Sequence, residues 1–116
     1  MPSLRHERVR ELLKRTLAEI LRREIDSSEC GLLNINEVGV GNDLKSAIVY
    51  VGVVGSEAQR RKAPNTLAKQ RGHLQSLLAR EVVLRYTPRI KFKLDDSIEQ
   101  GNRVLQILEE LEDRQA

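Results

Sequence analysis

Few residues of this chain have the types and spacing that catalysis needs. The adjacent acids Asp95 and Asp96 could act as a general acid and base, but neighbouring side chains point in different directions. The two histidines, His6 and His73, and the single cysteine, Cys30, complete neither a nucleophile–base pair nor a set of zinc ligands. The sequence therefore predicts that the protein is not an enzyme and holds no cofactor or metal.

Basic residues give the strongest chemical signal. Residues 56–93 carry ten lysines and arginines against two glutamates, a local balance of +8 in a chain whose net charge is +3. Residues 94–116 have the opposite balance, −5. Segregation of this kind is typical of a face that binds a polyanion, and nucleic acid is the leading partner class. The alternative is that the cations merely lie on exposed helices, and charge alone does not decide between the two.

Only three aromatic residues accompany the cations: Tyr50, Tyr86 and Phe92. A sheet that stacks several bases needs more, so RNA binding would rely on phosphate and shape contacts. The stretch Gly52-Val53-Val54-Gly55 matches the spelling of the GxxG loop of KH domains. We interpret it as a chance match, because it ends an expected strand and does not join two helices.

The 116 residues suffice for one domain, residues 1–116 with a core of about 5–111. Hydrophobic residues make up 40% and charged residues 32%, which suits a soluble globular protein. No stretch approaches the ~20 apolar residues of a membrane span, and no signal-peptide core follows the start of the chain. We expect a cytoplasmic protein without a membrane partner.

Apolar residues predict helices near both ends of the chain. From Leu4 to Ile25 they recur with the spacing of an amphipathic helix. A final helix, residues 97–113, is expected to begin where Asp96 and Glu99 have the spacing of a capping box. This last helix is strongly acidic.

Three strands are predicted between these helices. Leu32 to Val40 and Leu44 to Val54 form a hairpin around a Gly41-Asn42-Asp43 turn, and a third strand falls within Arg85 to Leu94. Alternation on the second strand separates Ala47, Val49, Val51 and Val53 from Ile48, Tyr50 and Gly52. On the third strand it buries Ile90, Phe92 and Leu94 and leaves Arg89, Lys91 and Lys93 on an uncovered face.

The segment between the second and third strands reads as two helices. Ser56 can cap the first, Pro64 kinks or restarts it, and Gln70-Arg71-Gly72 marks a break or kink. The predicted order is α-β-β-α-α-β-α, an α+β fold whose three-stranded sheet has helices on one face. If the break needs a backbone that only glycine tolerates, Gly72→Ala destabilises the protein.

Several stretches together resemble the bacterial ribosome-binding factor A family, from about Arg5 to Leu111. They are the opening helix, Asp43-Leu44-Lys45-Ser46-Ala47-Ile48-Val49-Tyr50-Val51, Gly72-His73-Leu74-Gln75-Ser76-Leu77-Leu78, Leu84-Arg85-Tyr86-Thr87-Pro88-Arg89-Ile90-Lys91-Phe92 and Asp95-Asp96-Ser97-Ile98-Glu99-Gln100-Gly101. The resemblance implies a single type-II KH-like domain that binds the free 30S small ribosomal subunit and its 16S rRNA. It further implies help in late maturation of the subunit core, a need for the protein in efficient 16S rRNA processing, and no nuclease activity. A monomer is expected, and other assembly factors, including a GTPase, are admitted as further partners.

The family has an Ala-x-Gly kink between two helices in place of the KH loop. The matching positions here are Gln70, Arg71 and Gly72, so the glycine is kept and the alanine is not. On this basis we expect contacts with rRNA from Lys69, Arg71, Gly72, Arg80, Arg85, Arg89, Lys91 and Lys93. A secondary patch is expected at Arg60, Arg61 and Lys62.

Two other functions remain open at this point. One is a general KH-type binder of single-stranded RNA, against which stand the missing basic GxxG loop and the scarcity of aromatic residues. The other is a protein-interaction module that recruits a basic partner through the acidic residues 97–113. Co-sedimentation with free small subunits is demanded by the assembly-factor hypothesis alone.

Overall fold

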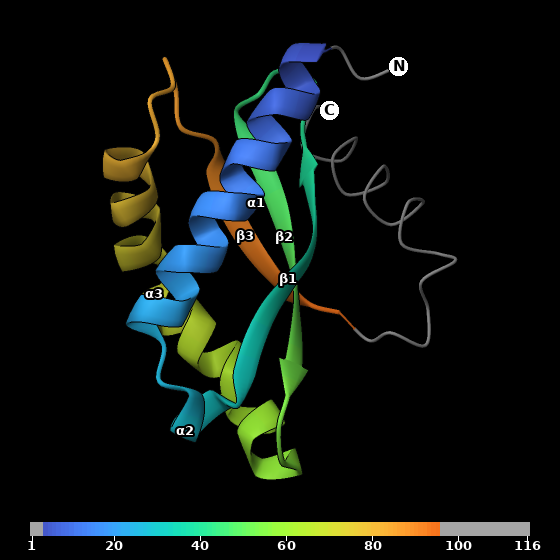
Figure 1. Cartoon of the computed structure of the whole chain (residues 1–116), viewed down its shortest axis with the longest axis vertical. Helices are drawn as coiled ribbons and strands as arrows, with labels where there is room; N and C mark the ends of the chain where they lie inside the picture. Colours follow the sequence, from blue (N-terminus) through green and yellow to red (C-terminus); the bar gives the residue numbers. More distant parts are fainter. Residues whose placement is uncertain (1–3, 96–116) are drawn as a thin grey trace.

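The computed structural model, which describes residues 4–95, has two long helices, one short helix and three strands (Figure 1). Their order is α1 (Leu4–Glu24), α2 (Ser27–Cys30), β1 (Leu32–Val40), β2 (Ser46–Val54), α3 (Glu57–Glu81) and β3 (Arg89–Leu94). The expected final helix, residues 97–113, lies outside the described residues.

Helix α1 covers one face of the sheet, as its apolar spacing predicts (Figure 1). Val9, Leu13, Leu17 and Ile20 form its buried stripe and pack into the main core. Helix α3 joins the same core through Leu67, Leu74 and Leu78, so α1 and α3 share the core face of the sheet. No helix in the described part of the chain is long and apolar enough to cross a membrane.

The sheet has the strand order β1-β2-β3, with β2 in the centre. β1 and β2 pair antiparallel, from Leu32 opposite Val54 to Val40 opposite Ala47. β2 and β3 pair parallel, which requires a long crossover, and α3 supplies it. This arrangement makes β3 an edge strand packed against α3.

The predicted alternation along β2 is confirmed, and Arg89 and Lys91 of β3 are exposed as predicted, but the same face is buried where it is formed by β2. Ala47, Val49 and Val51 lie in the main core. Ile48 and Tyr50, on the other face, form a second buried cluster with exposed fractions of 0% and 3%. Because Ile48 is opposite Lys91 in the parallel register, the cations of β3 share a face with buried residues, and Arg89 and Lys91 are exposed at its edge.

The hairpin turn is longer than the sequence predicts. β2 begins at Ser46 and not at Leu44, whose φ of 60° places it in the left-handed region. Asp43 Oδ1 accepts a hydrogen bond from the backbone N–H of Lys45 at 2.9 Å, and the carbonyl of Gly41 accepts one from Leu44 at 2.9 Å. These two bonds hold Leu44 out of the strand.

A short helix that the sequence analysis did not predict, α2, follows α1. Asp26 caps it, with Oδ1 accepting a hydrogen bond from the backbone N–H of Ser28 at 2.9 Å. Hydrogen bonds from the backbone and from the side chain of Ser28 lower the pKa of Asp26. Gly31 ends the helix with a φ of 76° and leads directly into β1.

Of the break or kink predicted at Gln70-Arg71-Gly72, the break is wrong, because α3 is one helix from Glu57 to Glu81. Ser56 caps it as expected, in a capping box with Gln59. The helix continues through Pro64. In Figure 1 its two ends run in different directions, with part of the helix behind α1. Gly72 does not have a left-handed φ, and a Cβ added there would meet nothing within 4 Å. The two predicted helices are therefore one bent helix.

Candidate nucleic-acid interface

Side chains of α3 fix the position of β3. Gln75 Oε1 accepts a hydrogen bond from the backbone N–H of Ile90 at 2.8 Å, and Gln75 Nε2 donates to the carbonyl of Pro88 at 2.9 Å. Arg71 Nη1 donates to the carbonyl of Ile90 at 3.4 Å. These bonds satisfy backbone groups of an edge strand and hold the cations of α3 and β3 in one arrangement.

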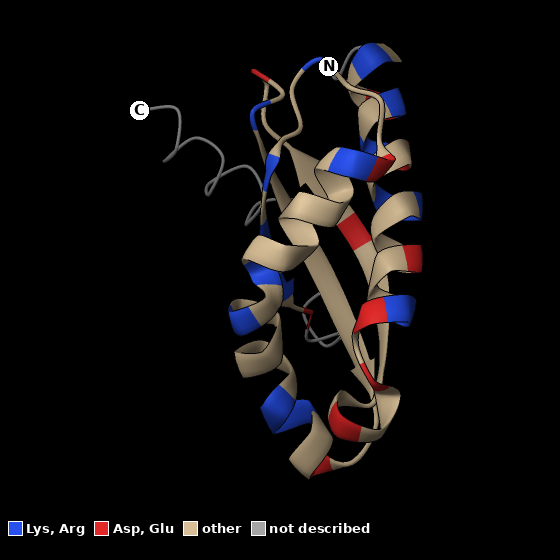
Figure 2. Ribbon diagram, turned by 90° about the vertical axis from the view of Figure 1, so that its left-hand side faces the viewer, with Lys and Arg blue, Asp and Glu red and all other residues tan. Residues whose placement is uncertain are grey.

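We call Lys69 and Arg71 of α3, with Arg89 and Lys91 of β3, the basic flank. Lys69, Arg89 and Lys91 are exposed, whereas Arg71 is half-buried because it reaches the backbone of β3. Figure 2 shows Lys and Arg along this side of the molecule, while acids and bases are mixed along α1. The fourth predicted cation nearby, Lys93, is half-buried and not openly exposed as expected.

A groove of about 240 Å³ runs between α3 and β3 beside these cations. Arg71 and Lys91 stand at an apolar lining formed by Pro64, Leu67, Ala68, Phe92 and Leu94. The expectation that Leu94 is buried is wrong, since its exposed fraction is 41%, and Phe92 is half-buried. Both side chains lie toward the end of β3, where they line the groove.

The two acids of the basic segment are both paired with arginines. Arg23 of α1 contacts Glu81 Oε2 at 2.5 Å, and Arg61 lies 4.0 Å from Glu57. Arg23 also bonds Glu24 at 3.3 Å. The charge of Glu81 is thus directed to α1 and away from the basic flank.

The remaining predicted contact residues are not gathered in one place. Arg60 lines a separate hollow with Asn34, Asn36 and Asp95, and Arg61 and Lys62 are exposed on the first turns of α3. Arg80 is exposed near the end of α3, and Arg85 is exposed in the loop before β3. Gly72 is exposed within the helix. The structure therefore divides the predicted set among at least three parts of the surface.

The residues considered for acid–base chemistry are held apart by different partners. Asp95 Oδ2 accepts a hydrogen bond from Asn36 at 2.7 Å, and His6 Nε2 lies 3.2 Å from the carbonyl of Val40. His73 Nε2 lies 2.8 Å from Glu24 Oε1. Among residues 4–95, no group of three or more His, Cys, Asp or Glu could hold a metal ion.

The contact between His73 and Glu24 links α3 to the end of α1. Its hydrogen bond is the main cause that lowers the pKa of Glu24, and Arg23 contributes in the same direction. The sequence analysis gave His73 no such structural partner. Its actual partner lies 49 residues away in the chain, beyond the reach of any local pattern.

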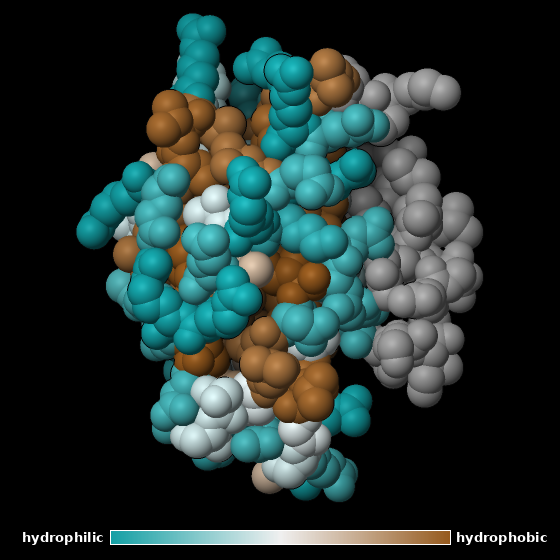
Figure 3. Space-filling model, in the orientation of Figure 1, coloured by the Kyte–Doolittle hydropathy of each residue, from teal (hydrophilic) through white to brown (hydrophobic). Residues whose placement is uncertain are grey.

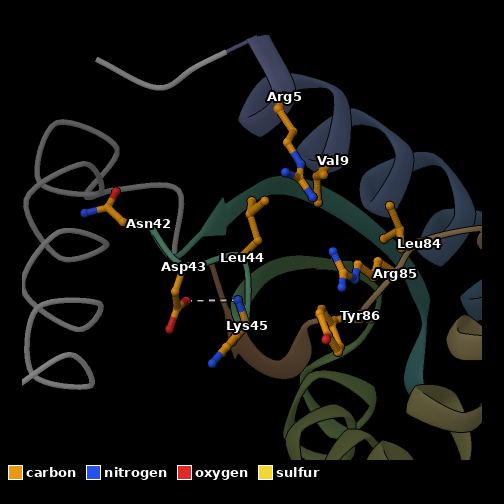
Figure 4. Close-up of a pocket in the computed structure, with 9 residues that line it drawn as sticks. All are labelled: Arg5, Val9, Asn42, Asp43, Leu44, Lys45, Leu84, Arg85 and Tyr86. Carbon is orange, nitrogen blue, oxygen red and sulfur yellow. Dashed lines mark hydrogen bonds between the residues drawn. The ribbon is translucent and has the colours of Figure 1, made fainter.

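Sequence reasoning also missed a pocket of about 360 Å³ near the start of α1 (Figure 4). It is lined by Arg5, Val9, Asn42, Asp43, Leu44, Lys45, Leu84, Arg85 and Tyr86. Tyr86 is 68% exposed, and the guanidinium carbon of Arg85 lies 5.6 Å from its ring centroid. An aromatic residue next to an arginine in a loop was the one signal available in the sequence.

Comparison with known proteins agrees with this architecture. The family model described as ribosome-binding factor A matches residues 5–108. A ribosome-binding factor A from Macrococcus caseolyticus is 40% identical over 94% of this chain and 96% of the relative. The corresponding protein from Halothermothrix orenii is 35% identical over 99% of this chain and 94% of its own length.

Solved structures show the same fold. The crystal structure of ribosome-binding factor A from Thermus thermophilus has 30% identity and a TM-score of 0.65, over 76% of this chain and 93% of that one. A homology model of the Thermus thermophilus ribosome-binding factor A, fitted into a cryo-EM map of its complex with the 30S subunit, has 30% identity and a TM-score of 0.60. The match covers 72% of this chain and 88% of that one. The predicted α+β, KH-like fold with a three-stranded sheet is confirmed. On the family match and the near full-length relatives together, this chain belongs to the ribosome-binding factor A family.

Proposed function

We propose that this protein is a cytoplasmic ribosome assembly factor that binds the free 30S subunit through its 16S rRNA. It acts as a monomer, assists late maturation of the subunit core, and is needed for efficient 16S rRNA processing without cutting RNA itself. Other assembly factors, including a GTPase, act on the same subunit.

The basic flank is the observation that carries this proposal. Lys69, Arg89 and Lys91 are exposed, and α3 is tied to β3 by three hydrogen bonds that involve Gln75 and Arg71. These bonds fix the relative position of the two backbone segments that carry the cations, which suits the fixed phosphate spacing of a folded RNA. The Thermus thermophilus relative fitted into a 30S complex supports the same partner.

Binding through phosphates makes affinity depend steeply on salt. For Z neutralised phosphates, log K falls against log salt with a slope of about −0.7Z to −0.9Z. Replacing Arg89 and Lys91 by glutamate removes two such contacts, so we expect weaker binding and a slope shallower by about 1.4 to 1.8. Filter binding of purified 30S subunits at several salt concentrations measures both quantities.

A matched variant, Arg8→Glu with Arg15→Glu, controls for the change in net charge. Both arginines are exposed on α1, away from the basic flank. We expect the two double variants to unfold within about 1 kcal/mol of the wild type, because exposed substitutions usually change stability by under ~0.5 kcal/mol each. Equal losses of affinity in the two variants would contradict the assignment of the interface.

Sedimentation separates this function from the alternatives. In a sucrose gradient of cell extract, the protein should co-migrate with free small subunits and be absent from translating ribosomes. Migration with all RNA would favour a general single-stranded RNA binder, and migration with a protein complex free of rRNA would favour an interaction module. Precursor 16S rRNA incubated with the purified protein alone should stay intact.

A further inference from the structure

A pocket separate from the groove between α3 and β3 lies where three distant segments meet (Figure 4). Arg5 comes from the first turn of α1, Leu44 from the hairpin turn, and Tyr86 from the loop before β3. Hydrophilic side chains cover most of the face seen in Figure 3, and apolar atoms appear there as separate patches. The pocket combines apolar side chains with three cations, Arg5, Lys45 and Arg85.

The lining of the pocket combines apolar side chains, cations and one aromatic ring. Val9, Leu44 and Leu84 provide apolar surface and are buried or half-buried in the main core. Figure 4 shows the guanidinium groups of Arg5 and Arg85 directed toward the space next to these side chains. A planar ligand with a negative charge at its edge matches this combination.

Tyr86 supplies the planar element. It is 68% exposed, and the Arg85 guanidinium lies over one face of its ring at 5.6 Å. Such a cation–π contact orients the ring, most of which is exposed and can be reached by a ligand. Exposed aromatic rings beside basic residues are the platforms on which unpaired bases stack.

The positive charge of the pocket suits both a nucleotide and an acidic protein segment, and the size of the pocket decides between them. Asp43 is the one acid among the described residues that line it, and its Oδ1 accepts the backbone N–H of Lys45. A volume of about 360 Å³ falls near the lower end of small-molecule pockets, ~300–1,000 Å³, which suits one ring system and not a helix.

We propose that this pocket takes one unpaired base of RNA, stacked on Tyr86, with its flanking phosphates bound by Arg5 and Arg85. Arg85 lies four residues before Arg89, so the site extends the basic flank toward α1. The inference rests on the proposed function, and it adds a base contact to an interface otherwise made of phosphate contacts.

A fluorescent variant tests stacking without the ribosome. The chain has no tryptophan, so Tyr86→Trp introduces a single reporter in the pocket. A short oligoadenylate should quench this fluorescence, because a stacked base contacts the ring, whereas inorganic polyphosphate should not. Quenching by polyphosphate to the same extent as by oligoadenylate, or no quenching by oligoadenylate, would overturn the proposal.

Two further variants test the site on the 30S subunit. Tyr86→Leu keeps an apolar side chain but removes the ring, and we expect about a five- to hundredfold loss of affinity with an unchanged salt slope. Tyr86→Phe keeps the ring and should bind as the wild type does. Arg5→Gln should instead make the salt slope shallower by about 0.7 to 0.9.

The outcomes separate this inference from the proposed function. If the wild type binds 30S subunits and Tyr86→Leu binds equally well, the base site is wrong and the assembly role stands. If the wild type fails to bind 30S subunits, the assembly role is wrong, and quenching by oligoadenylate still decides whether the pocket takes a base.

Discussion

Gly72→Ala is the substitution for which the structure reverses the expectation drawn from the sequence. A glycine that enforces a break would lose stability on gaining a Cβ. In the structure Gly72 lies well inside α3, is exposed, and leaves the space around an added Cβ empty to 4 Å. We therefore expect the alanine variant to be more stable than the wild type.

The magnitude follows from helix propensity, because no packing is gained or lost. Alanine is favoured over glycine in a helix interior by about 0.8–1.0 kcal/mol, and part of this comes from the reduced freedom of the unfolded chain. For a domain of this size, 1 kcal/mol raises the melting temperature by about 3–6 °C. Binding to 30S subunits should not change, since the helix keeps its course.

Gly31→Ala is the matched control, with the same chemical change at a position of opposite character. Gly31 has a φ of 76°, and an added Cβ would lie 2.7 Å from the carbonyl oxygen of Val54. We expect this variant to lose about 1 kcal/mol of stability or more. A compatible change of this kind gains only about 0.4–1 kcal/mol. Urea denaturation of both variants and the wild type measures the three free energies of unfolding.

A lower free energy of unfolding for Gly72→Ala would refute the reasoning. It would mean that the bend of α3 needs glycine at this position despite the open space. If 30S binding fell together with stability, the arrangement of Lys69 and Arg71 would depend on that bend.

Two further predictions concern the contacts that hold the helices in place. Gln75→Ala should lower the free energy of unfolding by about 1–3 kcal/mol, because it removes the partners of the Ile90 N–H and the Pro88 carbonyl, whereas Ser76→Ala, at an exposed neighbour, should be nearly neutral in the same urea titration. Stability should also fall as the pH drops through about 5 to 3, because hydrogen bonds lower the pKa of Glu24 and Asp26 in the folded state and their stabilisation is lost on protonation. Thermal melts across this range check the sign, and a Glu24→Gln variant with the same pH dependence as the wild type would contradict the role of Glu24.

Local patterns account for the parts of the fold that the sequence predicts. The stripe of α1, the hairpin and the alternation of β2 each depend on residues within one element, whose period reveals the buried face. The Ser56 cap is likewise a contact over three residues. Such features need no knowledge of the rest of the molecule.

The course of α3 could not be predicted in this way. Pro64 and Gly72 both disfavour a helix locally, yet Leu67, Leu74 and Leu78 bury their side chains in one core. The burial of these three leucines outweighs the helix-propensity cost of about 1 kcal/mol at Gly72. The sequence shows the cost directly and the compensation only through residues elsewhere in the chain.

The candidate sites depend even more on distant contacts. Arg71 is predicted to contact rRNA, and the sequence gives no sign that its guanidinium also donates a hydrogen bond to the carbonyl of Ile90. Arg5, Leu44 and Tyr86 meet in one pocket although some forty residues separate each from the next. The sequence shows which residue types these are, but it does not show that they lie close together in space.

The parallel pairing of β2 with β3 bears on the order in which the chain folds. β1 and β2 can pair as soon as the turn between them forms, because they are adjacent in the chain. β3 can pair with β2 only after the 25-residue helix α3 has formed the crossover between them. We expect β3 to dock last, and with it Arg89 and Lys91. A chain that has only reached the hairpin stage then lacks half of the basic flank, so we expect the proposed binding to the 30S subunit to require the completely folded protein.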